Sequence, residues 1–471
     1  MVTPASSGHR SSHASGAAAG KAARATARRS SHADWAPPPD RPDPVQTLVQ
    51  QARTRTPELV PIRNGRMLRS PFAFFRGGAA IMAADLARTP VSGIRAQLCG
   101  DAHLNNFGGF AAPDRSLVFD VNDFDETLPG PWEWDVKRLA ASIAVAGRDR
   151  GFGDDARADA VSGAVRAYRK AMRAFAGERT VDVWYARLDL EQQFTQWAVG
   201  LDASDRKVLD KTLKKARRKD SLRALAKLTY VVDGEPRIVS DPPLVVPIRD
   251  LFSADEAQLV RERLALSLQA YRRTLQADRR HLLDAYTLVD VAHKVVGVGS
   301  VGTRAWIMLL LGRDSSDPLF LQVKEADRSV LAPFAGRSRQ ANQGRRVVDG
   351  QRLIQAASDV FLGWVQIPDD RDATVRDYYV RQLWDAKISA PIDTMRAGEL
   401  GAYSEICGWT LARAHARSGD RVAIAGYLGK SDRFDRALAT FAESYADQNE
   451  RDYAAFAAAA QAGAVPVDLE H

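Results

Sequence analysis

The sequence predicts an α+β protein with a small lobe built on an antiparallel sheet and a larger, mainly helical lobe. Three aliphatic and β-branched runs, Leu288–Val296, Thr303–Leu311 and Pro318–Lys324, are separated by glycines or by an Asp-Ser turn, which is typical of a three-stranded antiparallel meander. Most of the remaining chain shows the apolar spacing of helices. Its 471 residues are enough for two or three domains with a sizeable core.

The first 45 residues are expected to form a disordered tail. Ser, Ala, Gly and Arg dominate up to residue 34, and five prolines follow before Val45. Such a composition buries too little apolar surface to offset the conformational entropy of the chain. The folded body is therefore expected to begin near Val45.

The next segment predicts a helix followed by two short strands. Ser70 and Pro71 provide an N-cap and a first-turn proline, and apolar residues recur at helical spacing from Phe72 to Leu86. The runs Ile94–Leu98 and Ser116–Val121 are strand-like, with a loop rich in Asn and Gly between them.

Helices predominate on either side of the meander. Residues 136–232 are expected to be mostly helical, and Asp255–Ala285 to form one long helix with arginines on its exposed face. After the meander, the pattern predicts a helix over Val347–Leu362, a strand over Tyr378–Leu383 and a helix over Glu399–Ala416.

The net charge of +8 comes from two segments and not from the body of the chain. Residues 1–34 hold five basic residues and one acid, and Arg206–Lys227 holds ten basic residues and two acids, which leaves 51 basic and 55 acidic residues elsewhere. No aromatic residue falls between Trp197 and Tyr230, so the second segment lacks stacking side chains for nucleic acid. We expect a solvated helical face there and no nucleic-acid partner.

Three features indicate a cytoplasmic protein without a membrane partner. The longest apolar run, Ala305–Leu311, has seven residues, far below the ~20 residues that span a bilayer. Cys99 and Cys407 are far apart in the sequence, and neither needs a disulfide partner in a reducing compartment. The N-terminal segment also lacks the apolar stretch of a secretory signal.

The richest polar segment lies between residues 100 and 126. It contains the strings GDAHLNNF and FDVNDFDE, so acidic and amide side chains follow both short strands. Carboxylate and amide oxygens are ligands for Mg²⁺, which usually shares its site with substrate phosphates. The pairing of two such polar loops indicates a metal and phosphate site.

The spacing in this segment resembles that of kinase catalytic loops. Asp101 and Asn106 are five residues apart, like the Asp that accepts the substrate hydroxyl proton and the Asn that holds metal in protein kinases. Asp123 follows a strand and precedes a phenylalanine, as the metal-binding Asp of kinases does. The pattern Gly-Asp-x-His-x-x-Asn resembles the aminoglycoside and choline phosphotransferase branch, and Asp135 resembles the aspartate that braces the catalytic loop in that branch.

This resemblance implies a role for each polar residue. Asp101 and His103 form the catalytic group, with Asp101 orienting or deprotonating an acceptor hydroxyl and His103 orienting the loop. The implied cofactors are ATP and Mg²⁺. The expected metal ligands are Asn106, Asp123 and Asp125, with Asp120 as an alternative to Asp125.

A glycine-rich loop and a lysine extend the resemblance. Gly297, Gly299 and Gly302 match G-x-G-x-x-G, a loop that covers nucleotide phosphates in kinases. The same pattern occurs in dinucleotide-binding folds, where a helix follows and an acid such as Glu325 would bind the ribose. Because a strand is predicted after Gly302, the kinase arrangement is favoured, and Lys324 is expected to contact the α and β phosphates of ATP.

The order of these elements differs from that of kinases. The glycine loop and Lys324 come about 200 residues after the catalytic loop, whereas they precede it in kinases. We therefore expect a circularly permuted, bilobal protein-kinase-like fold, which is possible when the original termini lie close together at the surface.

One kinase feature is missing from the sequence. Lys324 should pair with a helix glutamate, but no Glu occurs between Glu325 and Glu399. The candidate substitutes are Gln351, Gln355, Asp349 and Asp359.

Nearly the whole chain, from Arg69 through the Gly100–Asp101 loop to Gln448, resembles a bacterial family of unknown function, domain-of-unknown-function family 2252. This resemblance supplies no activity, so the predicted mechanism depends on the residues described above.

Together these features predict a phosphotransferase that uses ATP and Mg²⁺ and transfers to a hydroxyl group on a small molecule or a protein. A nucleotide-binding pseudokinase, a metal-dependent hydrolase that uses only the Asp101–Asp125 cluster, and AMP transfer are the alternatives. Four parts are expected: a basic, proline-rich tail (1–45), a mainly helical catalytic lobe (46–286), a small β-sheet nucleotide-binding lobe (287–390) and helices that complete the catalytic lobe (391–471).

Overall fold

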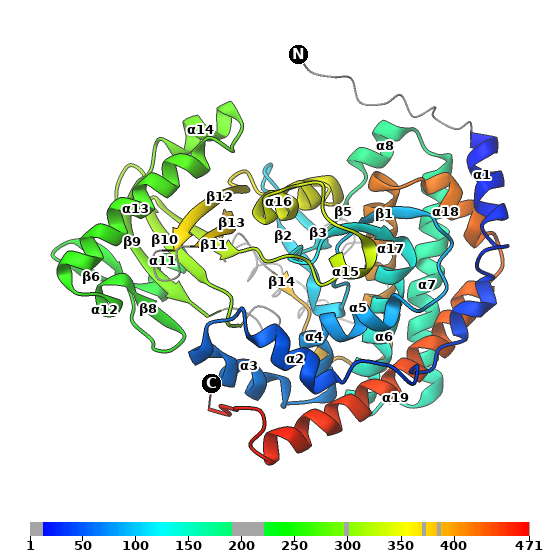
Figure 1. Ribbon diagram of the computed structural model, residues 1–471. Coiled ribbons are helices and arrows are strands. Elements are labelled where there is room, and N and C mark those ends of the chain that lie inside the picture. Colours follow the sequence, from blue (N-terminus) through cyan, green and yellow to red (C-terminus); the bar gives the residue numbers. More distant parts are fainter. Residues whose placement is uncertain (1–12, 191–220, 296–300, 370–373, 384–387, 471) are drawn as a thin grey trace, which may run out of the picture.

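The computed structural model describes residues 13–190, 221–295, 301–369, 374–383 and 388–470 and has an α+β architecture (Figure 1). A six-stranded antiparallel sheet with flanking helices occupies one side of the molecule, and long helices occupy the other. A smaller four-stranded sheet lies between them. The predicted α+β class is therefore confirmed.

The predicted meander forms the centre of the six-stranded sheet. β9 (Thr287–Lys294), β10 (Ala305–Leu311) and β11 (Pro318–Glu325) pair antiparallel in sequence order. Every residue of β11 is buried, which suits its place between β10 and a later strand and the aliphatic residues of its first half. The sheet is completed by β8 (Val245–Pro247) beside β9, and by β13 (Thr374–Gln382) and β12 (Gly363–Asp369) beyond β11.

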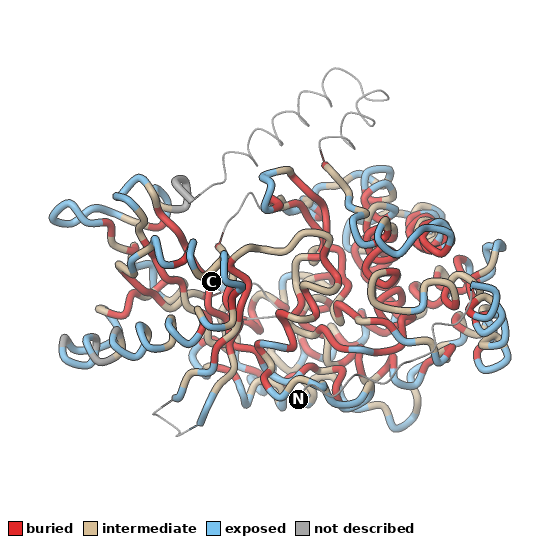
Figure 2. Tube along the Cα trace, turned by 90° about the horizontal axis from the view of Figure 1, so that it is seen from above, coloured by how far each residue is buried: buried red, intermediate tan, exposed pale blue. Residues whose placement is uncertain are grey.

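Long helices build the core of the other side. Figure 2 shows their buried stretches in red. Trp132 stacks on Tyr168 with ring centroids 5.6 Å apart. Two of these helices pack so closely that a Cβ on Gly408 would lie 2.1 Å from Ala164 O, so this contact requires glycine. The helices are α6 (Trp132–Asp149), α7 (Asp154–Gly177), α17 (Ala397–Ser418) and α19 (Arg433–Gln461).

The helix predicted over Phe72–Leu86 is divided in two. α4 (Pro71–Gly77) and α5 (Ala79–Leu86) are separated at Gly78, where the backbone leaves helical geometry. Ser70 caps α4 as predicted, because its Oγ accepts a hydrogen bond from the backbone N–H of Ala73 at 3.2 Å.

The single helix expected over Asp255–Ala285 is also divided. α13 (Ala254–Arg272) and α14 (Ala277–Leu283) are joined by a short turn. This turn brings Leu283 into one apolar cluster with Tyr271 and Leu275, whereas in a straight helix Leu283 would lie about 120° around the axis from Tyr271.

The Asn- and Gly-rich loop contains a strand that the sequence does not predict. β2 (Phe107–Ala111) pairs with β3 (Leu117–Val121) on one edge and with β14 (Ile388–Ser389) on the other. Two glycines in β2 weaken its strand signal, but they also allow the pairing, since a Cβ on Gly108 would lie 2.4 Å from Ile388 O.

Later elements match the prediction in kind, with shifted ends. The helix expected over Val347–Leu362 is α16 (Gln343–Ile354), which begins earlier because Asn342 caps it by accepting a hydrogen bond from Arg345 N at 2.7 Å. The strand expected over Tyr378–Leu383 belongs to β13, and the helix expected over Glu399–Ala416 is α17.

The N-terminal segment differs from the predicted disordered tail wherever the structure describes it. Residues 13–45 contain α1 (His13–Ala22), the 3-10 turn η1 (Arg29–Ala33) and the start of α2 (Pro44–Ala52). α1 lies against α18 (Arg421–Leu428) so closely that a Cβ on its Gly20 would be 2.0 Å from a backbone oxygen of α18.

Arginines fasten this segment to the end of α18. Arg24 donates to Tyr427 O and Gly426 O, and Arg29 donates to Leu428 O, so they satisfy carbonyls that have no partner within the helix. The small residues and arginines that suggest disorder by composition thus contact helices at the other end of the chain. Composition alone does not reveal such distant partners.

Part of the predicted basic surface lies outside the described residues. The stretch 191–220 is not described, and α11 (Ser221–Leu228) contains the last residues of the basic segment.

Within the described ranges, no helix combines the length and apolar composition that crossing a bilayer requires. Cys99 and Cys407 are both buried and unpaired.

Arg41 forms a buried ion-pair network with two later helices. Its Nε lies 2.8 Å from Asp85 Oδ1, and its second terminal nitrogen lies 2.6 Å from Asp452 Oδ2. Arg41→Ala leaves two buried carboxylates without their cation, so we expect the free energy of unfolding in urea to fall by about 3–5 kcal/mol. Arg88→Ala, which removes an exposed pair with Asp40, should leave the midpoint unchanged. Equal midpoints for Arg41→Ala and the unmodified protein would contradict this role.

Lys137 on α6 is fully buried beside Glu133. Burial lowers the pKa of Lys137 to about 7, with the carboxylate of Glu133 opposing the shift. Its Nζ donates to Pro90 O at 3.3 Å and lies 5.4 Å from the centre of the Phe441 ring.

This shift predicts a pH dependence of stability. The unfolded chain keeps the Lys137 proton up to its ordinary pKa of 10.5, whereas the folded chain releases it near pH 7. The unfolded state therefore binds more protons in this window, and stability rises with pH by at most about 1.4 kcal/mol per pH unit. Urea denaturation at pH 7, 8 and 9 should show this rise in the unmodified protein and in the exposed variant Lys170→Met. The rise should be absent in Lys137→Met, and an equal slope in that variant would refute the assignment.

Candidate active site

The two polar segments of the sequence meet at one end of the β2–β3 hairpin. The ladder pairs Phe107 with Val121, and the Asn122 N–H donates to Asn106 O at 2.8 Å. Asn106 and Asp123 therefore lie at the same end of the hairpin, although 17 positions separate them in the sequence. The hairpin is what brings the predicted metal ligands together.

The loop before the hairpin is held by side chains of the helical core. The Asp135 carboxylate accepts hydrogen bonds from the backbone N–H groups of Cys99 at 2.8 Å and Gly100 at 3.1 Å. Ser142 Oγ accepts one from Leu104 N at 2.9 Å. The bracing contact expected of Asp135 is thus present in the structure.

Asp101 is the carboxylate at the centre of this loop. Its Oδ1 accepts a hydrogen bond from Arg138 Nε at 2.8 Å, which fixes its orientation. Burial raises the pKa of Asp101 above its ordinary range, and the charge of Arg138 opposes this shift. A carboxylate in this environment accepts a proton more readily than one in water.

His103 lies beside Asp101 as a neutral ring. Its Nε2 is 3.7 Å from Asp101 Oδ2, which is too far for a hydrogen bond. Burial lowers the pKa of His103 well below its ordinary value, and the charges of Arg138 and Arg76 add to this effect. His103 Nδ1 is buried without a hydrogen-bond partner among the described residues.

Lys324 from β11 reaches the segment that follows the hairpin. Its Nζ forms a hydrogen-bonded ion pair with Asp125 Oδ2, and the hydroxyl of Tyr379 donates to Asp125 Oδ1 at 2.8 Å. Lys324 and Tyr379 are directly paired on β11 and β13, so one face of the sheet presents both groups to Asp125. The contact joins residues 199 positions apart.

The charges in this contact shift the pKa values of both partners. Burial by itself would raise the pKa of Asp125, but Lys324 and the hydrogen bond from Tyr379 hold it below its ordinary value. Burial likewise opposes the ammonium of Lys324, but Asp125 raises its pKa above the ordinary value. Both groups are therefore charged at neutral pH.

Asp123 has the opposite tendency. Burial raises the pKa of Asp123, and the neighbouring charge of Asp125 raises it further. Its Oδ1 accepts a hydrogen bond from Asp125 N at 3.1 Å. Asn105 Oδ1, in the short 3-10 turn before β2, is buried without a hydrogen-bond partner among the described residues.

These residues fit a hard cation. Asn106 donates its Nδ2 to Asp101 O at 2.8 Å, which leaves its Oδ1 as an acceptor at the end of the hairpin that also carries Asp123. Within the described ranges, no group of three or more His, Cys, Asp or Glu side chains could hold a metal ion. A site built on Asn106 and Asp123 would therefore depend on oxygens from phosphates and water, as Mg²⁺ sites commonly do.

Asp120 is engaged elsewhere. Its two oxygens lie 2.6 Å and 2.7 Å from the guanidinium of Arg413, and Oδ2 also accepts from Ala356 N at 3.0 Å. Both side chains are buried. The suggestion that Asp120 is an accessory metal ligand is therefore wrong, and its role is to tie β3 to α17.

Only the last position of the glycine loop can be described. Gly297 and Gly299 lie outside the described residues. Gly302 has a φ of +91°, and its carbonyl accepts from Thr56 N at 2.7 Å. The segment after it is strand β10, as the kinase arrangement requires, whereas a dinucleotide-binding fold would have a helix. The Glu325 carboxylate, the alternative ribose ligand, pairs with Arg304 and Arg376.

The four substitutes considered for the helix glutamate have other partners. Gln351 donates to Gln355, Gln355 donates to Val121 O, Asp349 pairs with Arg345, and Asp359 accepts from Phe361 N. The carboxylate that pairs with Lys324 comes from Asp125 and not from α16.

α16 contributes an arginine instead of a glutamate. Arg346 is buried and donates to Asp125 O at 2.8 Å and to Thr127 O at 2.7 Å.

Sequence reasoning missed Arg346 and Tyr379, because their contacts depend on strand register and helix placement and leave no local signal. Arg138 follows Asp135 by three positions, so its place on the same helix face was accessible from the sequence.

An apolar cavity lies away from these groups. It has a volume of about 550 Å³ and is lined by apolar residues of α13 and of the sheet, including Val323 and Val380. These residues are next to Lys324 and Tyr379 in their strands, so their side chains point to the opposite face of the sheet. The size of this cavity therefore does not mark the polar site.

The fold and the polar cluster define an α+β protein in which a sheet lysine meets the acidic end of a hairpin. A family model described as an uncharacterized protein conserved in bacteria, DUF2252, matches residues 55–459. The chain therefore belongs to this family, and all the candidate site residues lie within the match. No curated protein and no solved structure matches the chain.

Gly100 provides a test of how tightly the loop is held. Its φ is +89°, and a Cβ would lie 2.3 Å from Glu126 O, whereas Gly93 has a φ of +82° and nothing within 4 Å. Gly93→Ala should cost about 1 kcal/mol of stability from the backbone conformation alone. Gly100→Ala should cost about 1–3 kcal/mol more, because the loop and Glu126 must separate. Urea denaturation measures both losses of stability. Equal losses in the two variants would show that the close contact between Gly100 and Glu126 does not contribute to stability.

Proposed function

We propose that this protein is an ATP- and Mg²⁺-dependent phosphotransferase with a circularly permuted, bilobal kinase-like fold. The carrying observation is the contact of Lys324 with Asp125, next to the hairpin end that bears Asn106 and Asp123. A kinase site needs a sheet lysine and a metal-binding aspartate on either side of one nucleotide. Catalysis depends on this convergence in space and not on the order of the elements in the chain.

Each residue of the site would have one role. The glycine loop (Gly297, Gly299 and Gly302) would cover the triphosphate of ATP, and Lys324 would contact its α and β phosphates. Asn106 Oδ1 and Asp123 would hold Mg²⁺, which neutralises charge on the phosphates.

Asp101, oriented by Arg138, would accept the proton of the acceptor hydroxyl or orient that group for attack. Its raised pKa supports this role. The acceptor would be a small molecule or a protein bearing a hydroxyl. We place the reaction in the cytoplasm, where ATP is available and where buried, unpaired cysteines such as Cys99 and Cys407 are stable.

The proposal is tested by ADP formation from ATP with Mg²⁺. Asp123→Asn and Lys324→Met should each lower turnover by about 100-fold or more, since each removes a charge that stabilises the transferring phosphoryl group. Asp114→Asn is the matched control, because Asp114 lies at the other end of the same hairpin and pairs with Arg187 near the surface. Equal turnover by folded samples of all three variants and the unmodified protein would refute the phosphotransferase.

A second candidate is a pseudokinase that binds ATP without transferring phosphate. The observation that supports it is that Lys324 pairs with Asp125 and not with a helix glutamate, as it would in an active kinase. The other oxygen of Asp125 accepts a hydrogen bond from Tyr379, so both oxygens already have partners. Calorimetric titration with ATP distinguishes the two. Tight binding that Lys324→Met abolishes, with no ADP formed in the presence of candidate acceptors, would favour the pseudokinase.

A further inference from the structure

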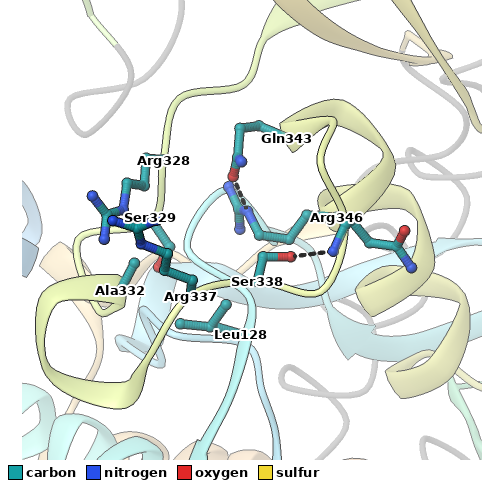
Figure 3. Close-up of a pocket in the computed structure, with 9 residues that line it drawn as sticks. Leu128, Arg328, Ser329, Ala332, Arg337, Ser338, Gln343 and Arg346 are labelled. Carbon is teal, nitrogen blue, oxygen red and sulfur yellow. Dashed lines mark hydrogen bonds between the residues drawn. The ribbon is translucent and has the colours of Figure 1, made fainter.

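A polar pocket lies beside the active-site segment. It occupies about 300 Å³ between the connection that follows β11 and the first turns of α16. Figure 3 shows Arg328 and Ser329 on one side of it and Gln343 and Arg346 on the other. None of the residues that line it is acidic, and three are arginines, the third being Arg337.

Arg346 gives the pocket a fixed positive charge. It is 3% exposed, and its guanidinium donates to Asp125 O, Thr127 O and Asp327 O at 2.7–2.8 Å, and to the side chain of Gln343. All of these acceptors are neutral oxygens. The hydrogen-bonding capacity of Arg346 is thus largely satisfied, and no carboxylate of the described residues forms an ion pair with it.

Arg328 and Arg337 add exposed donors at the rim. Both are exposed, and neither forms a hydrogen bond or ion pair with another described residue. Ser338 Oγ accepts from Gln340 N at 3.0 Å, so its hydroxyl proton remains available to a ligand. Two free guanidinium groups around a buried third one form a cationic site with planar, paired donors.

We propose that this pocket binds a small molecule through a phosphate group. Planar guanidinium groups match the oxygens of phosphate. The carboxylates of Asp125, Glu126 and Asp327 act on Arg346 but do not line the pocket, so the charges that face a ligand there are those of the arginines. The volume lies at the lower end of the range for small-molecule pockets, which fits inorganic phosphate or a short phosphate monoester.

The pocket walls also hold the active-site segment. Ser329 Oγ donates to Glu126 O at 2.8 Å, and Val330 N donates to the Glu126 carboxylate at 2.7 Å. Arg346 holds the carbonyls on either side of Glu126. A phosphate that bridges Arg328, Arg337 and Arg346 therefore ties both walls to the backbone that carries Asp125.

Binding is tested without ATP or Mg²⁺, so the result does not depend on the proposed phosphotransferase. Inorganic phosphate and glycerol 3-phosphate are titrated calorimetrically at constant ionic strength, with chloride as the balancing anion. Arg328→Gln and Arg337→Gln should each weaken binding by about tenfold, because each removes a charge-assisted contact. Arg339→Gln is the matched control, since Arg339 is an exposed arginine of the same segment that does not line the pocket.

Retained affinity in Arg339→Gln with loss in the other two variants supports the site. A tighter constant for glycerol 3-phosphate identifies an organic phosphate as the ligand, and equal constants identify phosphate itself. Equal weakening in all three variants would show only general attraction to surface charge and overturn the proposal. Asp123→Asn must leave the affinity unchanged. Without Mg²⁺ the Asp123 carboxylate repels phosphate, so tighter binding in this variant would place the bound phosphate at the nucleotide site and also overturn the proposal.

Discussion

The ion pair between Lys324 and Asp125 is the contact around which this structure is organised. Both side chains are largely removed from water, and burying two charges is favourable only when geometry and further hydrogen bonds compensate the loss of hydration. Tyr379 supplies one such bond, and Arg346 holds the Asp125 backbone. The pair therefore requires the sheet, α16 and the hairpin to be placed accurately with respect to one another.

The aspartates near this pair differ in their environments although they are close in sequence. Asp125 is held ionised by Lys324, whereas burial and the charge of Asp125 favour the protonated form of Asp123. Asp120 is neutralised by Arg413 and stabilises the fold. Asp101 is oriented by Arg138 and has a raised pKa. Neighbouring carboxylates with divergent pKa values are typical of sites that separate charge stabilisation from proton transfer.

Arginine is the residue that joins distant segments in this protein. Arg24 and Arg29 fasten the N-terminal helix to the end of α18, and Arg41 links Asp85 to Asp452. Each uses the planar, multiply donating guanidinium to satisfy acceptors that a helix or a buried carboxylate leaves open. The family match begins at residue 55, so these three arginines lie outside the matched region.

By itself, the sequence determined the α+β class, the meander of β9, β10 and β11, and the polar segments after two short strands, because periodicity and residue chemistry are local properties. Only the tertiary structure decided which carboxylate meets Lys324 and that Asp120 belongs to a buried ion pair. It also decided that Arg346, and no glutamate, projects from α16 toward Asp125, and that the N-terminal segment packs. Each of these depends on strand register and on contacts between residues far apart in the chain, which local patterns do not encode.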